Sequence, residues 1–216
     1  MRERELKFDL ASEAATARLE ALLGDPVGGR LQVNRFFDAA DGRLRRGLWA
    51  LRLRGGWEVG GPTALADGGQ PPGRPPDQVI LSLKGAREGS GAFHDRREEQ
   101  VALPARFWGR AALAADDLPP PWRALLPALP ALPERLAEFA RFTNLRRAFR
   151  LTDAWRAEVD RTRFGNGRRA WELEVEIGAA DDPDAARAAV EALLGRAGVA
   201  VRPQGKSKLE RALGAD

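Results

Sequence analysis

The sequence predicts an α+β protein built on eight antiparallel strands, as a closed barrel or a strongly curved sheet, with helices packed outside. Eight segments have the length and composition of strands, and most follow one another with only a turn or loop between them, as in antiparallel folds. Several of them carry charged side chains at alternate positions, and the chain has no internal repeat. A barrel with an inward-facing polar surface accommodates both features.

The first half of the chain alternates strands with turns. Ser12 provides an N-cap for a helix that ends near Gly24, just after the first strand. Asp41 and Gly42 form a turn signal between the second and third strands. Residues 55–77 are rich in glycine and proline and predict a long loop. The strands expected in this half are 2–9, 30–38, 47–54, 78–84 and 92–103.

Proline divides the second half of the chain. Residues 104–138 place prolines at 119–121, 127, 130 and 133 among Ala, Leu and Trp, which predicts a helical insertion of short, broken helices. A helix with proline in its first turn and glycine at its end is expected from Pro183 to Gly195. Neither proline-rich stretch is typical of a domain boundary, so residues 1–216 are expected to form one domain. The remaining expected elements are strands 143–151, 154–162 and 169–177, and a short helix or strand at 206–213.

Composition restricts the chemistry. The chain has 216 residues, of which 44% are hydrophobic, enough for a sizeable core. It contains no cysteine and one histidine, so disulfides, thiolate sites and histidine-rich metal sites are excluded. Any metal must be held by carboxylates, which favours Mg²⁺ or Mn²⁺. No apolar run approaches the roughly 20 residues of a membrane span, and the charged N-terminus lacks a signal-peptide core, so a cytoplasmic location is expected.

The strands carry charges where a buried face would be apolar. Alternate residues of a strand share a face, so each row of such charges points one way. The rows are Glu3, Glu5 and Lys7; Arg52 and Arg54; Arg96 and Glu98; and Glu172, Glu174 and Glu176, with single bases at Lys84, Arg146 and Lys208. Any one row is more often a solvated face. Several rows in one small β-rich chain favour a common interior, where bases bind phosphate oxygens and acids bind the accompanying cations.

These motifs, in this order, resemble the CYTH domains, the triphosphate tunnel metalloenzymes. The resemblance covers nearly the whole chain, and the ordered set is much more specific than any one motif. It rests on Glu-Arg-Glu-Leu-Lys at 3–7, Asn-Arg-Phe-Phe-Asp at 34–38, Leu-Arg-Leu-Arg at 51–54, Leu-Ser-Leu-Lys-Gly at 81–85, Asp-Arg-Arg-Glu-Glu at 95–99, Asn-Leu-Arg-Arg-Ala-Phe-Arg-Leu at 144–151, Glu-Leu-Glu-Val-Glu-Ile at 172–177 and Lys-Ser-Lys-Leu-Glu-Arg-Ala-Leu at 206–213. It implies an eight-stranded antiparallel closed barrel that forms a tunnel.

The resemblance also implies site residues. Those expected to bind the triphosphate are Lys7, Arg52, Arg54, Lys84, Arg96, Arg146 and Lys208. Those expected to bind metal are Glu3, Glu5, Asp160, Glu172, Glu174 and Glu176, with Glu174 and Glu176 favoured in the acidic strand and the register left open. Glu3, Glu5 and Lys7 are the expected catalytic residues, with Lys7 on the leaving or terminal phosphate or on the attacking water. His94, a lone histidine, is expected at the surface.

The function implied is metal-dependent hydrolysis of a triphosphate. Inorganic triphosphate is the leading substrate because no segment of the sequence indicates a pocket for a base or for thiamine. The alternatives are an adenylate cyclase of the class that shares this barrel, and a thiamine triphosphatase in which Trp49 or Trp57 stacks on the heterocycle. A non-catalytic polyphosphate- or nucleotide-binding module is disfavoured, since an anion binder gains nothing from its carboxylates. The net charge of +4 and the mixture of arginines with glutamates argue against nucleic acid as the partner.

Overall fold

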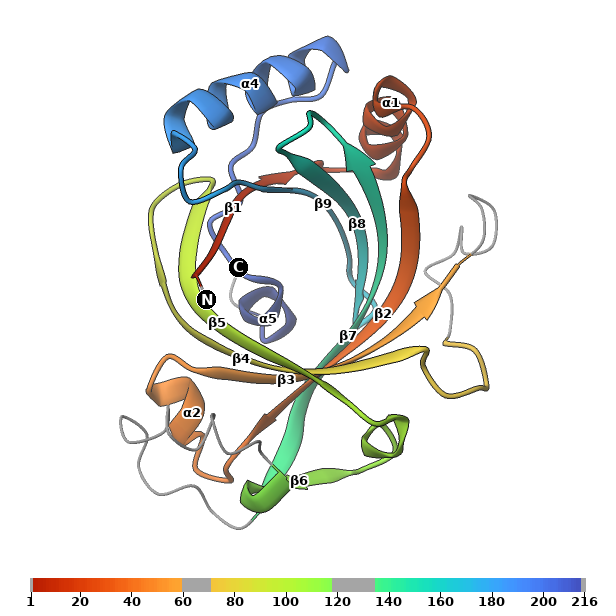
Figure 1. Ribbon diagram of the computed structural model, residues 1–216, viewed down its shortest axis with the longest axis vertical. Coiled ribbons are helices and arrows are strands. Elements are labelled where there is room, and N and C mark those ends of the chain that lie inside the picture. Colours follow the sequence, from red (N-terminus) through yellow and green to blue (C-terminus); the bar gives the residue numbers. More distant parts are fainter. Residues whose placement is uncertain (1, 60–70, 118–134, 215–216) are drawn as a thin grey trace.

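Eight antiparallel strands close into a barrel in the computed structural model, which describes residues 2–59, 71–117 and 135–214 (Figure 1). The order around the ring is β2-β3-β4-β5-β1-β9-β8-β7, and pairing of β7 with β2 closes it. A further strand, β6, extends the sheet along the beginning of β7. The strands are β1 (Arg2–Asp9), β2 (Gly28–Asp38), β3 (Ala50–Glu58), β4 (Gln78–Glu88), β5 (Phe93–Leu103), β6 (Ala112–Ala114), β7 (Arg135–Arg150), β8 (Arg156–Phe164) and β9 (Arg169–Glu176).

Most apolar side chains of the strands point outward, against covering elements; Phe36 and Phe142 instead line the inside, where they pack with α5 (Lys208–Ala212). Helices α1 (Glu13–Leu23) and α4 (Pro183–Arg196) lie over one side of the barrel (Figure 1). There Leu6 and Phe8 of β1 pack in one core with Leu19 of α1 and Val190 of α4. Because these outward faces are buried by helices, the opposite faces of the same strands are free to be polar.

A second core covers the other side of the barrel. It packs Leu44 of the short helix α2 (Arg43–Arg46) and Leu113 of β6 against the outward residues of β3 and β4. Gly55 of β3 meets Trp108 here: a Cβ on this glycine would lie 2.9 Å from the indole ring. Glycine therefore lets the indole approach the strand backbone.

Several element boundaries differ from the sequence prediction. The third strand begins at Ala50 because residues 47–49 form the turn that ends α2, with their amides bonded back to its carbonyl oxygens. It continues through Glu58 into the predicted loop of 55–77. The expected helical insertion at 104–138 is wrong where the structure describes it. There the chain forms two 3₁₀ turns (Ala105–Phe107 and Ala115–Asp117), β6, and the start of β7, eight residues before the expected strand. The prolines from 119 to 133 lie outside the described residues.

The predicted helices form close to their expected positions. The Ser12 side chain accepts a hydrogen bond from the Ala15 amide and caps α1, and α4 begins at Pro183 as predicted. The C-terminal element is a helix, α5 (Lys208–Ala212), with a capping box between Ser207 and Glu210. No helix in the described part of the chain is long and apolar enough to cross a membrane.

Candidate active site

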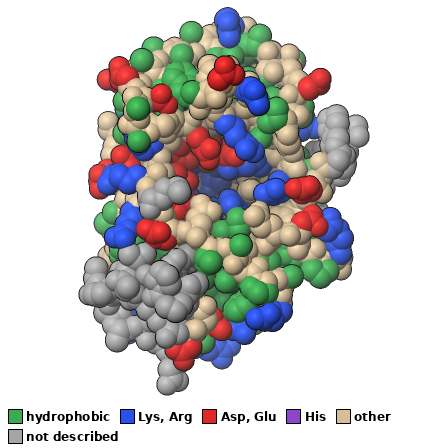
Figure 2. Space-filling model, viewed as in Figure 1, with side chains coloured by type: hydrophobic (Ala, Val, Ile, Leu, Met, Phe, Trp, Pro, Cys, Tyr) green, Lys and Arg blue, Asp and Glu red, His purple; other side chains and the backbone are tan. Residues whose placement is uncertain are grey.

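The barrel encloses a cavity of about 790 Å³, visible in Figure 2 as a hollow lined by acidic and basic side chains. Residues that line it alternate along β1, β3, β7 and β9, as the rows of charge predicted, while Glu172 of the β9 row is buried behind the lining. Of the expected site residues, the cavity is lined by Glu3, Glu5, Lys7, Arg52, Arg54, Lys84, Arg96, Arg146, Glu174, Glu176 and Lys208.

Three buried carboxylates form the acidic side. Asp160 on β8 is directly opposite Glu172 on β9, and Glu174 follows on the same face of β9. One oxygen from each lies within 4.8 Å of the others. We call Asp160, Glu172 and Glu174 the acidic triad. Glu176 lies outside this group, at the exposed end of β9 on the rim of the cavity.

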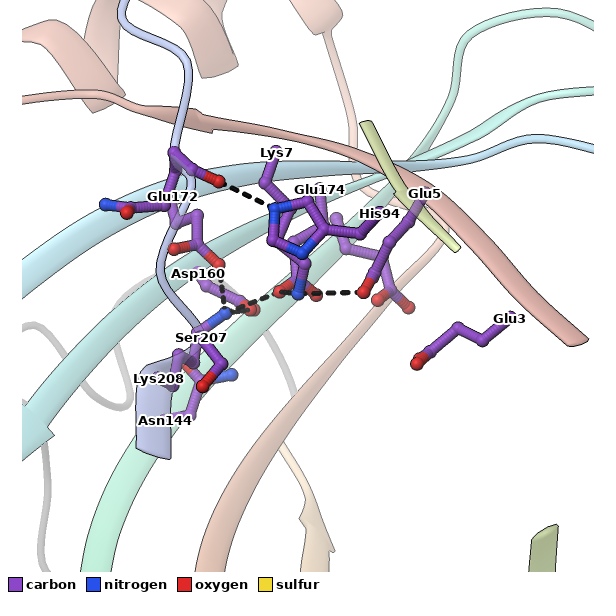
Figure 3. Close-up of polar contacts among 12 residues, drawn as sticks. Glu3, Glu5, Lys7, His94, Asn144, Asp160, Glu172, Glu174, Ser207 and Lys208 are labelled. Atoms are coloured by element: carbon purple, nitrogen blue, oxygen red, sulfur yellow. Dashed lines mark hydrogen bonds and ion pairs between the residues drawn. The ribbon is translucent and has the colours of Figure 1, made fainter. Parts of the chain in front are cut away.

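Cations crowd the acidic triad (Figure 3). The Lys208 ammonium lies 2.9 Å from Asp160, 2.5 Å from Glu172 and 2.6 Å from Glu174. Arg146 bonds to Asp160 at 2.6 and 2.8 Å and also contacts Glu174. Burial alone would raise the pKa of Asp160, but Arg146 and Lys208 hold it below its ordinary value. The pKa of Glu172 is raised by burial and by the neighbouring Glu174.

The row on β1 connects the acidic and basic sides. Lys7 Nζ lies 2.7 Å from Glu174 and 2.9 Å from Glu5. Glu3, two residues before Glu5 on the same face of β1, accepts hydrogen bonds from Lys84 at 2.9 Å and Arg96 at 2.7 Å. Burial, Glu174 and Glu3 raise the pKa of Glu5.

The basic side carries more positive charge than its partners neutralise. Arg52 reaches only Glu98, at 3.4 Å, and Ser82, at 3.3 Å. Arg54 forms no hydrogen bond or ion pair among the described residues. Burial, together with Arg52 and Arg146, lowers the pKa of Arg54 to about 9. Burial and Arg96 likewise lower the pKa of Lys84 to about 8. An anion in the cavity would relieve this repulsion.

Two sequence-based assignments are changed by the structure. His94 is not at the surface: it is only 1% exposed, and its Nε2 lies 2.7 Å from the Gln204 carbonyl oxygen. Burial and the charge of Lys7 lower its pKa to about 4. Trp57 is buried in an outer core against Trp108, and Trp49 packs against the second core. Neither tryptophan lines the cavity, so neither is placed to stack on a substrate.

Sequence reasoning missed several residues of the site. Glu158 faces the cavity two positions before Asp160 on β8 and contacts Arg146; the i, i+2 spacing was the available signal. Arg211 on α5 is buried and contacts Glu172, which only the docking of α5 determines. Gln32, Asn34 and Asn144 add a neutral polar lining.

The donor set suits a hard divalent cation. Every candidate ligand is a carboxylate, and three of them converge in a buried group. Glu5 and Glu174 are bridged by the Lys7 ammonium, which contacts both. Carboxylate oxygens are the preferred ligands of Mg²⁺ and Mn²⁺. The residues present here fit such an ion.

Comparison with known proteins agrees with this geometry. A family model for the CYTH domain matches residues 1–212. A structure from Hippeastrum, named as a candidate adenylyl cyclase with a dominant triphosphatase activity, is 22% identical, with a TM-score of 0.80 over 99% of this chain and 96% of its own. A candidate adenylate cyclase from Bacillus halodurans is 18% identical, with a TM-score of 0.64 over 97% of each chain.

A more distant structure, the mimivirus capping-enzyme triphosphatase, is 11% identical, with a TM-score of 0.51 over 90% of this chain and 89% of its own. No curated protein matches. At these identities the solved structures establish the shared tunnel fold, while the family model covers almost the entire sequence. The chain therefore belongs to the CYTH domain family, the superfamily of triphosphate tunnel metalloenzymes.

Proposed function

We propose that this protein is a metal-dependent triphosphatase that hydrolyses a linear triphosphate, with inorganic triphosphate as the leading substrate. The observation that carries the proposal is the charge arrangement inside the barrel. Crowded cations, Arg54 among them without a partner in the described residues, line the same cavity as Glu174, the member of the buried acidic triad that reaches it. A polyanion accompanied by a divalent cation complements both sides at once.

The basic residues would hold the phosphates. Arg52 and Arg54 on β3 and Arg146 on β7, the two strands that flank β2, project into the same cavity, and guanidinium groups bind phosphate oxygens through paired hydrogen bonds. Lys84 and Arg96 extend the positive surface toward Glu3. Phosphoryl transfer needs positioning and charge stabilisation more than covalent chemistry from the protein, so this cradle supplies the main requirement.

The acidic residues would hold the metal. The acidic triad is the proposed ligand set, with Glu5 and Glu3 completing it along β1. A bound divalent cation would neutralise phosphate charge and lower the pKa of water. Lys7, held between Glu5 and Glu174, is placed to donate hydrogen bonds to the terminal phosphate or to orient the attacking water. Its ammonium stays charged, since Glu174 and Glu5 overcome the effect of burial and raise its pKa.

A substrate screen tests the proposal. Phosphate release is measured with inorganic triphosphate, ATP and thiamine triphosphate, each with Mg²⁺ and with Mn²⁺, and the ATP products are separated. Turnover of triphosphate with either metal is the expected result. Cyclic AMP with pyrophosphate as the main product from ATP would instead make the protein a cyclase. Tight binding of triphosphate without turnover would make it a binding module.

A matched pair of variants tests the phosphate cradle. Arg54→Ala removes a guanidinium that faces the cavity without a partner, so we expect a stable protein with KM raised about tenfold or more. Arg97→Ala is the control, because Arg97 is exposed and pairs with Glu99. A wild-type KM in Arg54→Ala would remove this residue from the substrate site.

A further inference from the structure

Lys208 lies where a metal ion would be expected. Its ammonium nitrogen is within 2.9 Å of one oxygen of each member of the acidic triad, and those carboxylates are also the only group of three or more acidic or histidine side chains in the described chain that converge closely enough to hold a metal. An ammonium group donates hydrogen bonds to surrounding oxygens, and a divalent cation is coordinated by them, so both favour the same group of carboxylates. Both cannot occupy the centre of one triad.

The charge around the triad points the same way. Besides Lys208, the three carboxylates are contacted by Arg146, Lys7 and Arg211. Four basic side chains therefore already face three acids. A divalent cation added to this group would meet like charges at contact distance, which is strongly unfavourable in a buried site.

The four cations differ in how easily they can leave. Arg146 is fixed in the middle of β7 and also contacts Glu158, and Lys7 is fixed in the middle of β1. Lys208 is the first residue of α5, a helix of five residues that lies within the ring of strands in Figure 1. Arg211 lies on the same helix but does not line the cavity, whereas the Lys208 side chain does, so a short movement carries the Lys208 ammonium from the carboxylates to a phosphate.

We propose that Lys208 is a tethered competitor of the metal: its ammonium holds the acidic triad closed in the substrate-free protein and moves to the triphosphate when the metal binds. This rests on the proposed function for the identity of the substrate, but the competition itself concerns only the metal and the lysine. It assigns Lys208 a part in metal selection and timing in addition to phosphate binding.

The test is metal binding without substrate. Mn²⁺ is titrated into the full-length protein and followed by calorimetry and by the electron paramagnetic resonance signal of free Mn²⁺, with no triphosphate present. We expect Lys208→Met to bind Mn²⁺ at least about tenfold more tightly than the wild type, because one repelling charge is gone. Lys208→Arg keeps the charge and should bind as weakly as the wild type.

Lys206→Met is the matched control. Lys206 lies two residues earlier, and its side chain makes no ion pair with the acidic triad, so its replacement should leave Mn²⁺ affinity unchanged. Folding of each variant is checked by thermal unfolding, and Lys208→Gln, which keeps a hydrogen-bond donor, replaces Lys208→Met should that variant not fold. Unchanged or weaker Mn²⁺ binding in the folded neutral variant would overturn the proposal. If the wild type hydrolyses no triphosphate but the neutral Lys208 variant still binds Mn²⁺ more tightly, the proposed function is refuted and the competition between lysine and metal stands.

Discussion

Glu172 and Glu176 share one face of β9 but lie in different surroundings. Glu172 is buried and opposite Asp160, whereas Glu176 is exposed and opposite Glu5 at the rim. Oxygens of Glu172, Glu174 and Asp160 lie within 4.8 Å of one another, so they can share one cation, whereas Glu176 is not part of this group. The geometry therefore favours Glu172 with Glu174 over the pair Glu174 and Glu176.

Substituting each glutamate separately tests that choice. We expect Glu172→Gln to reduce metal-dependent phosphate release by at least about 100-fold, and Glu176→Gln by less than about tenfold. Both variants keep the side-chain shape, and circular dichroism verifies the fold. A greater loss of activity in Glu176→Gln than in Glu172→Gln would instead favour Glu174 and Glu176 as the metal-binding pair.

His94 gives a second prediction at the scale of a residue. It faces Lys7 of β1, Arg87 of β4 and Arg96 of β5, and its Nε2 lies within hydrogen-bond distance of the Gln204 carbonyl oxygen. Its pKa in the folded protein is lowered to about 4 from 6.5. The unfolded chain therefore takes up the proton first as the pH falls. The stability due to the neutral imidazole is present above pH 6.5 and is lost as the pH falls toward 4.

The magnitude follows from that shift. At pH 5 the wild type should have lost about 2 kcal/mol of unfolding free energy through this group, relative to pH 7.5. The variant His94→Gln should lack this part of the pH dependence, which urea unfolding at both pH values measures. Because the chain has a single histidine, one imidazole proton resonance reports the pKa directly. A titration midpoint near 6.5 would contradict the prediction.

At the scale of elements, the sequence predicted the strands better than their surroundings. Alternating charges on β1, β3 and β9 mark the inward faces, because a period of two survives any small error in where a strand ends. The end of β3 was wrong because Gly55, Gly56 and Trp57 have the composition of a loop, and only the tertiary packing of Trp108 on that strand explains them. The start of β7 at Arg135 was wrong because it lies within the stretch whose prolines predicted broken helices. The contact of Arg211 with Glu172 depends on where α5 docks, and no local pattern contains that information.

Helix α5 is held to the barrel by one small aromatic cluster. Leu209 and Ala212 pack against Phe36, Phe142 and Phe164, which lie on three different strands. A helix of five residues has little stability of its own, so this packing and the capping box keep Lys208 and Arg211 in the site. The position of two basic residues thus depends on a few apolar contacts.

Loosening α5 should impair function before it impairs the fold. We expect Leu209→Ala to lower kcat/KM about tenfold while the unfolding temperature falls only a few degrees. Leu213→Ala is the control, because Leu213 is 48% exposed just after the same helix. Hydrogen exchange should show faster exchange confined to residues 207–213. A global loss of stability in Leu209→Ala with unchanged kinetics would show that α5 is only structural.

At the scale of the whole molecule, the barrel reverses the usual arrangement of a small β-barrel. Most of its apolar residues face outward under α1, α4, α2 and β6, and its interior, apart from the aromatic cluster under α5, is a network of opposed charges. Each charge is expensive to bury alone and tolerable when paired. A ligand that binds one member of an ion pair leaves the other member as a buried charge without its partner, which is unfavourable. Under the proposed function, a metal that binds the carboxylates frees basic side chains for the triphosphate, and a triphosphate that binds the basic side chains frees carboxylates for the metal.

Their effects on stability should therefore be coupled. A ligand that binds only the folded state raises the unfolding temperature, by an amount that grows with the logarithm of its concentration divided by its Kd. We expect Mg²⁺ alone and triphosphate alone to raise it little, and both together to raise it by clearly more than the sum. The measurement is thermal unfolding in the four combinations, at a total ionic strength kept constant with NaCl because salt also screens exposed charges. The excess shift should shrink in Arg54→Ala and persist in Arg97→Ala. Strictly additive shifts would mean that the two ligands bind independently, and that the charge pairs inside the barrel are not exchanged when the substrate enters.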